Sequence, residues 1–156
     1  MILSTSGPLR AAMAAEATLT TPQRKLLIVE DDPGLQSQLR WQFADAYEVL
    51  VAGDRESALA QIRRHEPPVV LQDLGLPPDD EGTSEGFATL EQTLALMPCA
   101  KVIVVTGHGD QQNAVRAVGL GAYDFYEKPV NTEILQLIVS RAYRVYELEE
   151  ENRQLQ

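Results

Sequence analysis

Four short runs rich in Leu, Ile and Val, and a fifth rich in aromatic residues, interrupt a more polar chain. They are KLLIVE from Lys25, YEVLVA from Tyr47, VVLQ from Val69, KVIVVT from Lys101 and AYDFYE from Ala122. Short apolar runs bounded by turn residues are typical of buried strands. The fourth run is also the most β-branched stretch of the chain, which favours a strand further.

Between these runs the apolar residues recur at helical spacing. The sets are Leu35, Leu39 and Phe43; Ala58, Leu59 and Ile62; and Phe87, Leu90, Leu94 and Met97. Asp32 followed by Pro33 predicts a helix N-cap with proline in the first position, and Asp54 predicts a second cap. A fourth helix is expected over residues 110–119, and a long fifth helix from residue 131 to the end.

Five strands that alternate with five helices predict an α/β fold with a doubly wound parallel sheet. We assign this domain to residues 24–144. Residues 1–23 are rich in Ala, Ser and Thr and lack the basic start and apolar core of a secretory signal, so we expect a flexible leader there. Residues 145–156 extend the last helix beyond the domain.

Composition narrows the function classes. The net charge is -10, from 13 basic and 23 acidic residues, which argues against nucleic-acid binding by this segment. No apolar run approaches the roughly 18–20 residues of a membrane span. A single cysteine, Cys99, excludes an internal disulfide and fits a reducing compartment, so we expect a cytoplasmic protein without membrane association.

Polar residues that could take part in catalysis or binding lie where the predicted strands end. Glu30 and Asp31 follow the first strand, Asp73 the third, Thr106 the fourth and Lys128 the fifth. The carboxyl ends of parallel strands share one edge of a doubly wound sheet, and binding sites form there. Each residue alone has an ordinary explanation as a cap, a turn residue or a solvated lysine. Their conjunction predicts a single pocket.

The chemistry of such a pocket follows from its charges. Three carboxylates repel one another unless a hard divalent cation neutralises them, and Mg²⁺ accepts this kind of oxygen ligand. Asp73 is central and is the natural nucleophile toward a phosphorus atom, which would give an acyl phosphate. The Lys128 ammonium and the Thr106 hydroxyl would stabilise charge on the transferred group.

The segments KLLIVEDDPG, VVLQDLGLP, KVIVVTG and GAYDFYEKP resemble the signature segments of bacterial two-component receiver domains. The resemblance covers about residues 25–146 and implies a flavodoxin-like strand order 2-1-3-4-5. It also implies Mg²⁺ as cofactor, a sensor histidine kinase as partner and a cis peptide bond before Pro129. The implied site comprises the phosphoacceptor Asp73, the metal ligands Glu30, Asp31, Asp73 and the backbone carbonyl of Gly75, the phosphoryl contacts Thr106 and Lys128, and the switch residues Thr106 and Phe125.

The loop after Asp73 departs from the family pattern because PPDDEGTSEG is unusually long. We expect its acidic residues near the pocket mouth, where they would disfavour an acidic partner or, the reading we favour, keep the loop soluble; they are Asp79, Asp80, Glu81 and Glu85. Gln72 stands where the family commonly has an apolar or small residue, and its amide would need a partner in a core. The lifetime of the phosphoryl group, which Gly75 and His108 would influence, stays open.

The last helix carries a heptad pattern. Ile138, Val145 and Asn152 occupy a positions, Leu148 and Leu155 occupy d positions, and Arg141 interrupts the d series. A single Asn at an a position favours a parallel two-stranded coiled coil, so we expect a homodimer through this helix. A solvated acidic helix end is the alternative.

The tail also resembles the linker of sigma-54-dependent, NtrC-like regulators. DLGLPPD and AVRAVGLGAYDFYEKP resemble the PEP-CTERM-box subgroup, which is associated with exopolysaccharide and protein-sorting gene clusters. This resemblance implies transcription control through a following ATPase and a DNA-binding segment. A stand-alone relay receiver is the alternative. An aspartate-dependent phosphatase, an actual enzyme, would need a second Asp where Gly75 stands, so we do not expect a conventional enzyme.

Overall fold

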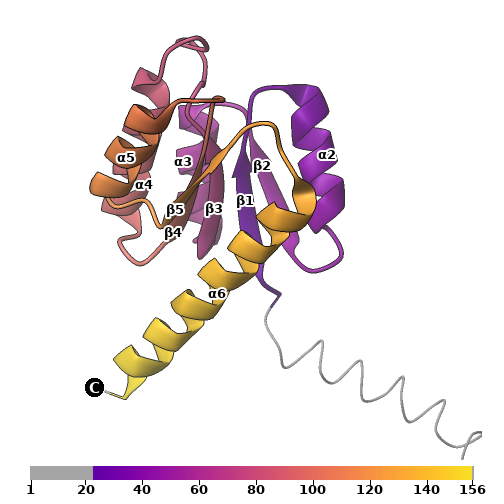
Figure 1. Cartoon of the computed structure of the whole chain (residues 1–156). Coiled ribbons are helices and arrows are strands. Elements are labelled where there is room, and N and C mark those ends of the chain that lie inside the picture. The colour runs from indigo at the N-terminus through magenta and orange to yellow at the C-terminus, as the bar shows by residue number, and fades with distance from the viewer. Residues whose placement is uncertain (1–22, 156) are drawn as a thin grey trace, which may run out of the picture.

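The computed structural model describes residues 23–155, and over this range five parallel strands form one sheet in the order β2-β1-β3-β4-β5 (Figure 1). The strands are β1 (Lys25–Val29), β2 (Glu48–Ala52), β3 (Val69–Asp73), β4 (Lys101–Thr106) and β5 (Asp124–Glu127). The helices are α2 (Pro33–Phe43), α3 (Arg55–His65), α4 (Ser84–Leu96), α5 (Gln111–Gly119) and α6 (Thr132–Gln154). The predicted fold class and strand order are confirmed. Apart from Gln23, the predicted leader at 1–23 lies outside the described residues.

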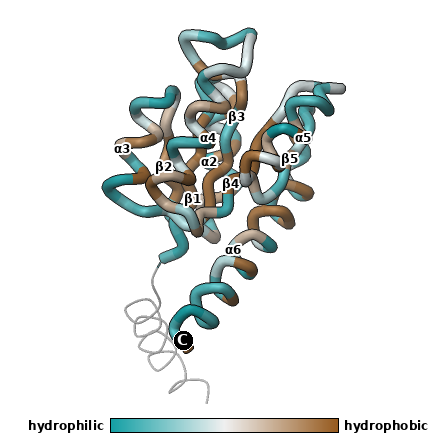
Figure 2. Tube along the Cα trace, turned by 90° about the vertical axis from the view of Figure 1, so that its left-hand side faces the viewer, coloured by the Kyte–Doolittle hydropathy of each residue, from teal (hydrophilic) through white to brown (hydrophobic). Residues whose placement is uncertain are grey.

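Successive side chains of the central strands point to opposite faces of the sheet and contribute to two separate hydrophobic cores. Leu27, Val70 and Val102 face one cluster with α3, α4 and α5, whereas the neighbouring residues face a second cluster with α2 and α6. Every residue of β3 is buried, as expected for a central strand covered on both faces. Figure 2 shows hydrophobic residues along the central strands and hydrophilic residues toward the far end of α6.

The predicted helix caps are confirmed. The Asp32 side chain accepts a hydrogen bond from Gly34 N, with Pro33 in the first helical position. Asp54 and Ser57 form a reciprocal capping box at the start of α3, with Ser57 N donating to Asp54 Oδ1 at 2.8 Å. Asn131 caps α6. These caps fix where each helix leaves the carboxyl edge of the sheet.

Two predicted strand starts were one or two residues early. Tyr47 precedes β2 because its N–H donates to Phe43 O and closes the end of α2. Ala122 precedes β5 because its N–H donates to Ala117 O at the end of α5. In both cases the backbone donor completes a helix terminus and is unavailable to the sheet.

Helix α6 links the two edges of the sheet. It begins beside the carboxyl ends of the strands and runs past their amino ends (Figure 1). At the amino edge Arg24 pairs with Glu147 at 2.9 Å and Lys101 pairs with Glu149 at 2.7 Å. Within the described part of the chain, none of the helices combines the length and the apolar character that crossing a bilayer requires.

Candidate functional site

Three carboxylates meet at the carboxyl edge of the sheet. Glu30 and Asp31 follow β1, and Asp73 ends the adjacent strand β3, where the register pairs Val29 with Gln72. Each of the three acids offers an oxygen within 4.8 Å of the others. Glu30 is only 3% exposed and Asp73 only 8%. Their convergence follows directly from the parallel register of two neighbouring strands.

Lys128 brings a positive charge to the same pocket from the end of β5. Its Nζ lies 3.1 Å from Asp73 Oδ2 and 3.8 Å from Glu30 Oε1. Its backbone N–H donates to Thr106 O, which fixes the chain after β5. Partial burial acts to lower the Lys128 pKa, but Asp73 and Glu30 outweigh it and raise that pKa overall. The ammonium therefore stays charged beside the predicted phosphoacceptor.

Glu30 is the acid most affected by its surroundings. Burial, and then repulsion from Asp73, raise the Glu30 pKa to about 8. A hydrogen bond from Asp32 N, at 3.1 Å, and the nearby Lys128 charge oppose that rise without cancelling it. Without a cation, the surroundings of Glu30 therefore favour its protonated form.

The two predicted switch residues lie beside the pocket but do not line it. Thr106 is buried at the end of β4, and its hydroxyl donates to Tyr126 O at 3.5 Å, the long limit of a hydrogen bond. Phe125 is 40% exposed on β5. In this arrangement the Thr106 hydroxyl is directed toward the β5 backbone, and the expected contact with a phosphoryl group needs a rotation of that side chain.

Gly75 forms the floor of the pocket next to Asp73. Its N–H donates to Asp73 Oδ1 at 3.2 Å. A Cβ built on Gly75 would lie 2.6 Å from Asp80 O, so the backbone of the long loop occupies the space that a side chain would need. This close approach gives a steric reason for glycine at position 75, in addition to the metal-ligand and phosphoryl-lifetime roles expected from the sequence.

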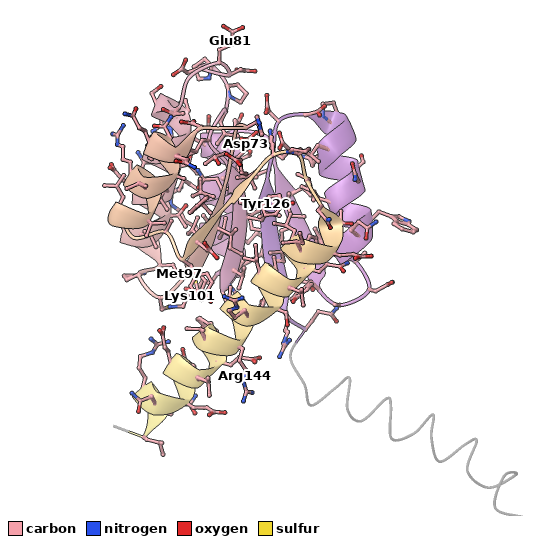
Figure 3. All side chains as sticks on the ribbon, in the orientation of Figure 1. Asp73, Glu81, Met97, Lys101, Tyr126 and Arg144 are labelled. Carbon is pink, nitrogen blue, oxygen red and sulfur yellow. The ribbon has the colours of Figure 1, made fainter. Side chains whose placement is uncertain are left out.

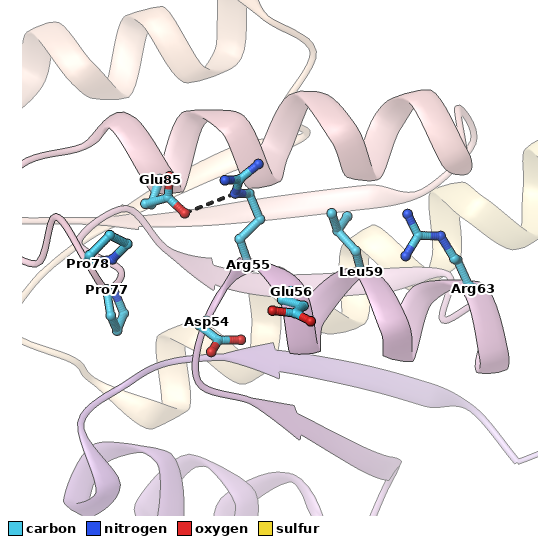
Figure 4. Close-up of a pocket in the computed structure, with 8 residues that line it drawn as sticks. All are labelled: Asp54, Arg55, Glu56, Leu59, Arg63, Pro77, Pro78 and Glu85. Carbon is cyan, nitrogen blue, oxygen red and sulfur yellow. Dashed lines mark hydrogen bonds and ion pairs between the residues drawn. The ribbon is translucent and has the colours of Figure 1, made fainter.

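The acidic residues of the long loop divide into two groups. Asp80 and Glu81 line the mouth of the pocket, as expected. Asp79 instead accepts a hydrogen bond from Ser84 N and holds the start of α4. Glu85 pairs with Arg55 at 2.9 Å beside a separate surface pocket (Figure 4). The prediction that all four gather at the mouth is therefore wrong for Asp79 and Glu85, which make local structural contacts.

Two residues left open by the sequence now have definite surroundings. Gln72 is fully buried, and its amide donates to Gly86 O at 2.6 Å, which ties β3 to α4. Its Oε1 has no hydrogen-bond partner among the described residues. His108 is exposed in the turn after β4 and is not among the residues that line the pocket.

The donor set suits Mg²⁺. Glu30, Asp31 and Asp73 supply hard carboxylate oxygens at one point, and Gly75 adds a backbone carbonyl to the pocket wall. Among the described residues, neither Cys99 nor a histidine belongs to the cluster, so it lacks the soft or imidazole donors typical of zinc sites. These residues would hold the cation, and the cation would supply the charge neutralisation that the acids lack.

Comparisons with known proteins agree with this geometry. The response regulator receiver domain family matches residues 26–140. Among curated relatives, the nitrogen assimilation regulatory protein NtrX of Azorhizobium caulinodans is 33% identical over 132 residues, 83% of this chain and 28% of that protein. The C4-dicarboxylate transport transcriptional regulatory protein DctD of Pseudomonas aeruginosa is 38% identical over 136 residues, 85% of this chain and 28% of its own length. The chain thus spans less than a third of these two relatives.

Solved structures show the same similarity. NtrX from Brucella abortus in complex with ADP has a TM-score of 0.79 and 31% identity, over 86% of this chain and 30% of that one. A CheY-like response regulator receiver domain protein from Methanospirillum hungatei has a TM-score of 0.74 and 29% identity, over 82% of this chain and 99% of that one. The match therefore extends both to a complete small domain and to part of a longer protein.

Proposed function

Because the chain belongs to the response regulator receiver domain family, we propose that it accepts a phosphoryl group on Asp73 from a sensor histidine kinase. The observation that carries the proposal is the contact of Lys128 Nζ with Asp73 Oδ2, at 3.1 Å, beside the Glu30 and Asp31 carboxylates. A nucleophile, a cation-binding pair and a fixed ammonium are the parts that phosphoryl transfer requires.

The proposed transfer is a displacement at phosphorus. A carboxylate oxygen of Asp73 attacks, an acyl phosphate bond forms, and the nitrogen–phosphorus bond of the phosphohistidine donor breaks. Bound Mg²⁺ would supply positive charge to the phosphoryl oxygens. Lys128 attracts the same oxygens, and Gly75 N holds one oxygen of Asp73 in place. The protein's contribution is positioning and charge, as expected of a signalling domain.

The switch that reports phosphorylation would use Thr106 and Phe125. A phosphoryl group on Asp73 offers the Thr106 hydroxyl a charged acceptor, which is stronger than the long hydrogen bond to Tyr126 O. Rotation of Thr106 toward the phosphoryl group would open space behind it. Phe125, half exposed on β5, would then turn inward and change the surface next to α6.

The output would be a homodimer through α6. Leu135, Val139, Ala142 and Tyr143 bury one side of this helix against the sheet. Ile134, Leu137, Leu148 and Leu155 are exposed along the opposite side, from the first turn to the last. This exposed stripe contains the d positions of the predicted heptads, whereas the first predicted a position, Ile138, packs against the core. The d positions support a parallel pairing of the outer part of two α6 helices.

In the whole protein this domain would regulate transcription. The longer relatives include a nitrogen assimilation regulatory protein and a transcriptional regulatory protein, which supports an output domain after this segment. We propose the sigma-54-dependent, PEP-CTERM-box type, with an ATPase and a DNA-binding part, acting in the cytoplasm. The gene sequence that follows Gln156 tests this. A phosphate-binding ATPase loop there supports the proposal, whereas a different output module contradicts it.

Phosphorylation of Asp73 is tested by incubating the protein with a small-molecule phosphodonor and Mg²⁺ and measuring intact mass. We expect one added phosphoryl group on the wild type and none on Asp73→Asn. Asp45→Asn, with the same loss of charge in the turn after α2, is the matched control and should be labelled like the wild type. Equal labelling of wild type and Asp73→Asn would overturn the proposal.

A further inference from the structure

The loop between β3 and α4, residues 76–83, is held in a defined position over the pocket. Leu76 is fully buried and anchors its start. Asp79 N donates to Leu76 O at 3.0 Å, and Gly82 N donates to Asp79 O at 3.1 Å, so two consecutive turns fold the loop. The Asp79 carboxylate accepts from Ser84 N and fastens the end of the loop to α4. We refer to residues 76–83 as the acidic loop.

The outer side of the acidic loop is also supported. Pro77 and Pro78 line a surface pocket next to the start of α3, and Arg55 reaches from α3 to Glu85 on α4 (Figure 4). The Arg55–Glu85 ion pair joins the two helices at the point where the loop returns to α4. The outer side of the loop therefore packs next to α3, in addition to the contacts that hold its two ends.

On its inner side the acidic loop presents Asp80 to the site. Asp80 O lies where a Cβ of residue 75 would be, so the loop backbone packs directly on the pocket floor. Asp80 also lines the pocket together with Glu30, Asp31 and Asp73. The next residue, Glu81, projects from the tip of the loop (Figure 3). Both acids line the pocket, but Asp80 is the one whose backbone packs against Gly75, next to the predicted metal ligands.

A fourth carboxylate in this position has an electrostatic cost without a cation. Four acids would then face the single ammonium of Lys128. Asp80 does not belong to the group of three oxygens that converge on one point, so it is placed outside the direct ligands. Magnesium usually keeps several of its waters when it binds protein carboxylates, and the hydrogens of those waters need acceptors.

We propose that Asp80 is a positioning residue for the hydrated Mg²⁺ of this site, accepting hydrogen bonds from metal-bound water at the mouth of the pocket. The acidic loop then forms part of the proposed phosphorylation site. Its extra length allows the chain to fold back so that Asp80 lies next to Gly75. This inference rests on the proposed function, since it assigns a further residue to the same site.

The test is calorimetric titration of Mg²⁺ into the full chain without phosphodonor. We expect Asp80→Asn to raise the dissociation constant for Mg²⁺ about three- to tenfold, because a full negative charge near a divalent ion is lost. Asp80→Glu should restore part of the affinity, since it keeps the carboxylate. Glu81→Gln removes the same charge from the adjacent residue at the tip of the loop, so it separates position from net charge and should weaken binding clearly less than Asp80→Asn does.

The outcomes separate the inference from the proposed function. If the wild type binds Mg²⁺ and Asp80→Asn binds it equally well, the inference is overturned and the proposed function stands. If Glu81→Gln weakens binding as much as Asp80→Asn, the loop acts only by its net charge and the positioning role is wrong. If the wild type itself does not bind Mg²⁺, the proposed function fails first. Thermal unfolding in EDTA should be similar for all variants, which excludes a merely structural effect of Asp80.

Discussion

At the scale of single residues, the pKa of Glu30 is set by burial and by neighbouring groups that act in opposite directions. Its pKa is raised from 4.5 to about 8, first by burial and then by Asp73. The folded protein therefore binds a proton more tightly than the unfolded chain does. Stability from this group is fully present below about pH 4.5 and is lost as pH rises toward 8.

We therefore expect the metal-free protein to lose stability between about pH 5 and pH 9, by as much as about 4 kcal/mol from Glu30. Urea unfolding in EDTA across this range measures the loss. Glu30→Gln, which cannot ionise, should show a distinctly shallower decline. Parallel curves for the two proteins would show that Glu30 is already ionised at neutral pH. Excess Mg²⁺ should restore wild-type stability at high pH, since the ion binds the ionised form.

Residue identities at this site were predictable, but side-chain directions were not. Asp73, Glu30 and Asp31 follow from strand ends and parallel pairing alone. The direction of the Thr106 hydroxyl depends on a rotamer, and the position of Asp80 depends on how a long loop folds back. Neither is encoded in a local pattern. Gln72 shows the same limit, since its partner Gly86 becomes visible only when α4 is placed against β3.

At the scale of elements, the site depends on a close contact between the start of α4 and the segment that follows β3. A Cβ on Gly86 would lie 2.3 Å from Leu74 O, which is backbone and cannot move aside cheaply. Gly86 also supplies the carbonyl that accepts the Gln72 amide. The first turn of α4 thus fixes the segment that carries Asp73 and Gly75.

We expect Gly86→Ala to destabilise the domain by about 3 kcal/mol, the upper range for overpacking a tight contact. Chemical denaturation measures this directly. Gly119→Ala is the matched control, because Gly119 is also helical and a Cβ there meets nothing within 4 Å. That variant should be neutral or slightly more stable, given the helix preference of alanine. Equal stability of the two variants would contradict the role assigned to the contact.

The elements themselves were largely predictable because each starts with a local signal. Asp32–Pro33 and Asp54 mark helix starts, and the short apolar runs mark strands. The errors at Tyr47 and Ala122 arose where a backbone N–H completes a preceding helix, which depends on the geometry of the helix end rather than on residue type. The same reasoning explains the misplacement of Glu85, whose partner Arg55 lies on a different helix.

At the scale of the whole molecule, α6 runs from the edge of the sheet that carries the proposed phosphorylation site to the opposite edge (Figure 1). It starts three residues after Pro129, at the carboxyl edge, and is tied by Arg24 and Lys101 to the amino edge of the sheet. These ion pairs are individually weak and act only at the amino edge, whereas the buried side of α6, from Leu135 to Tyr143, packs the helix against the sheet. We therefore propose that a displacement near Phe125 reaches the exposed stripe at Leu148 and Leu155 through a movement of α6 that leaves the helix folded.

If phosphorylation and α6 pairing are coupled, thermodynamics requires the coupling to act in both directions. A beryllium fluoride complex on Asp73, with Mg²⁺, should tighten the dimer about 5- to 150-fold, the usual range for such coupling. Because the dimer carries two such sites, each site should bind beryllium fluoride more tightly than the monomer does by the square root of that factor. Apparent affinity for beryllium fluoride should therefore rise with protein concentration, as measured by titration at concentrations below and above the dimer dissociation constant.

Leu148→Glu distinguishes this coupling from a local effect, because it places a charge at an exposed d position far from Asp73. Sedimentation equilibrium should show a monomer, and the affinity for beryllium fluoride should become independent of protein concentration. Gln154→Glu adds the same charge off the stripe and should behave like the wild type. If Leu148→Glu dimerises normally, α6 is not the interface. If Leu148→Glu is monomeric but the affinity of the wild type for beryllium fluoride does not depend on protein concentration, pairing and phosphorylation are independent. The signal must then leave the domain by another surface.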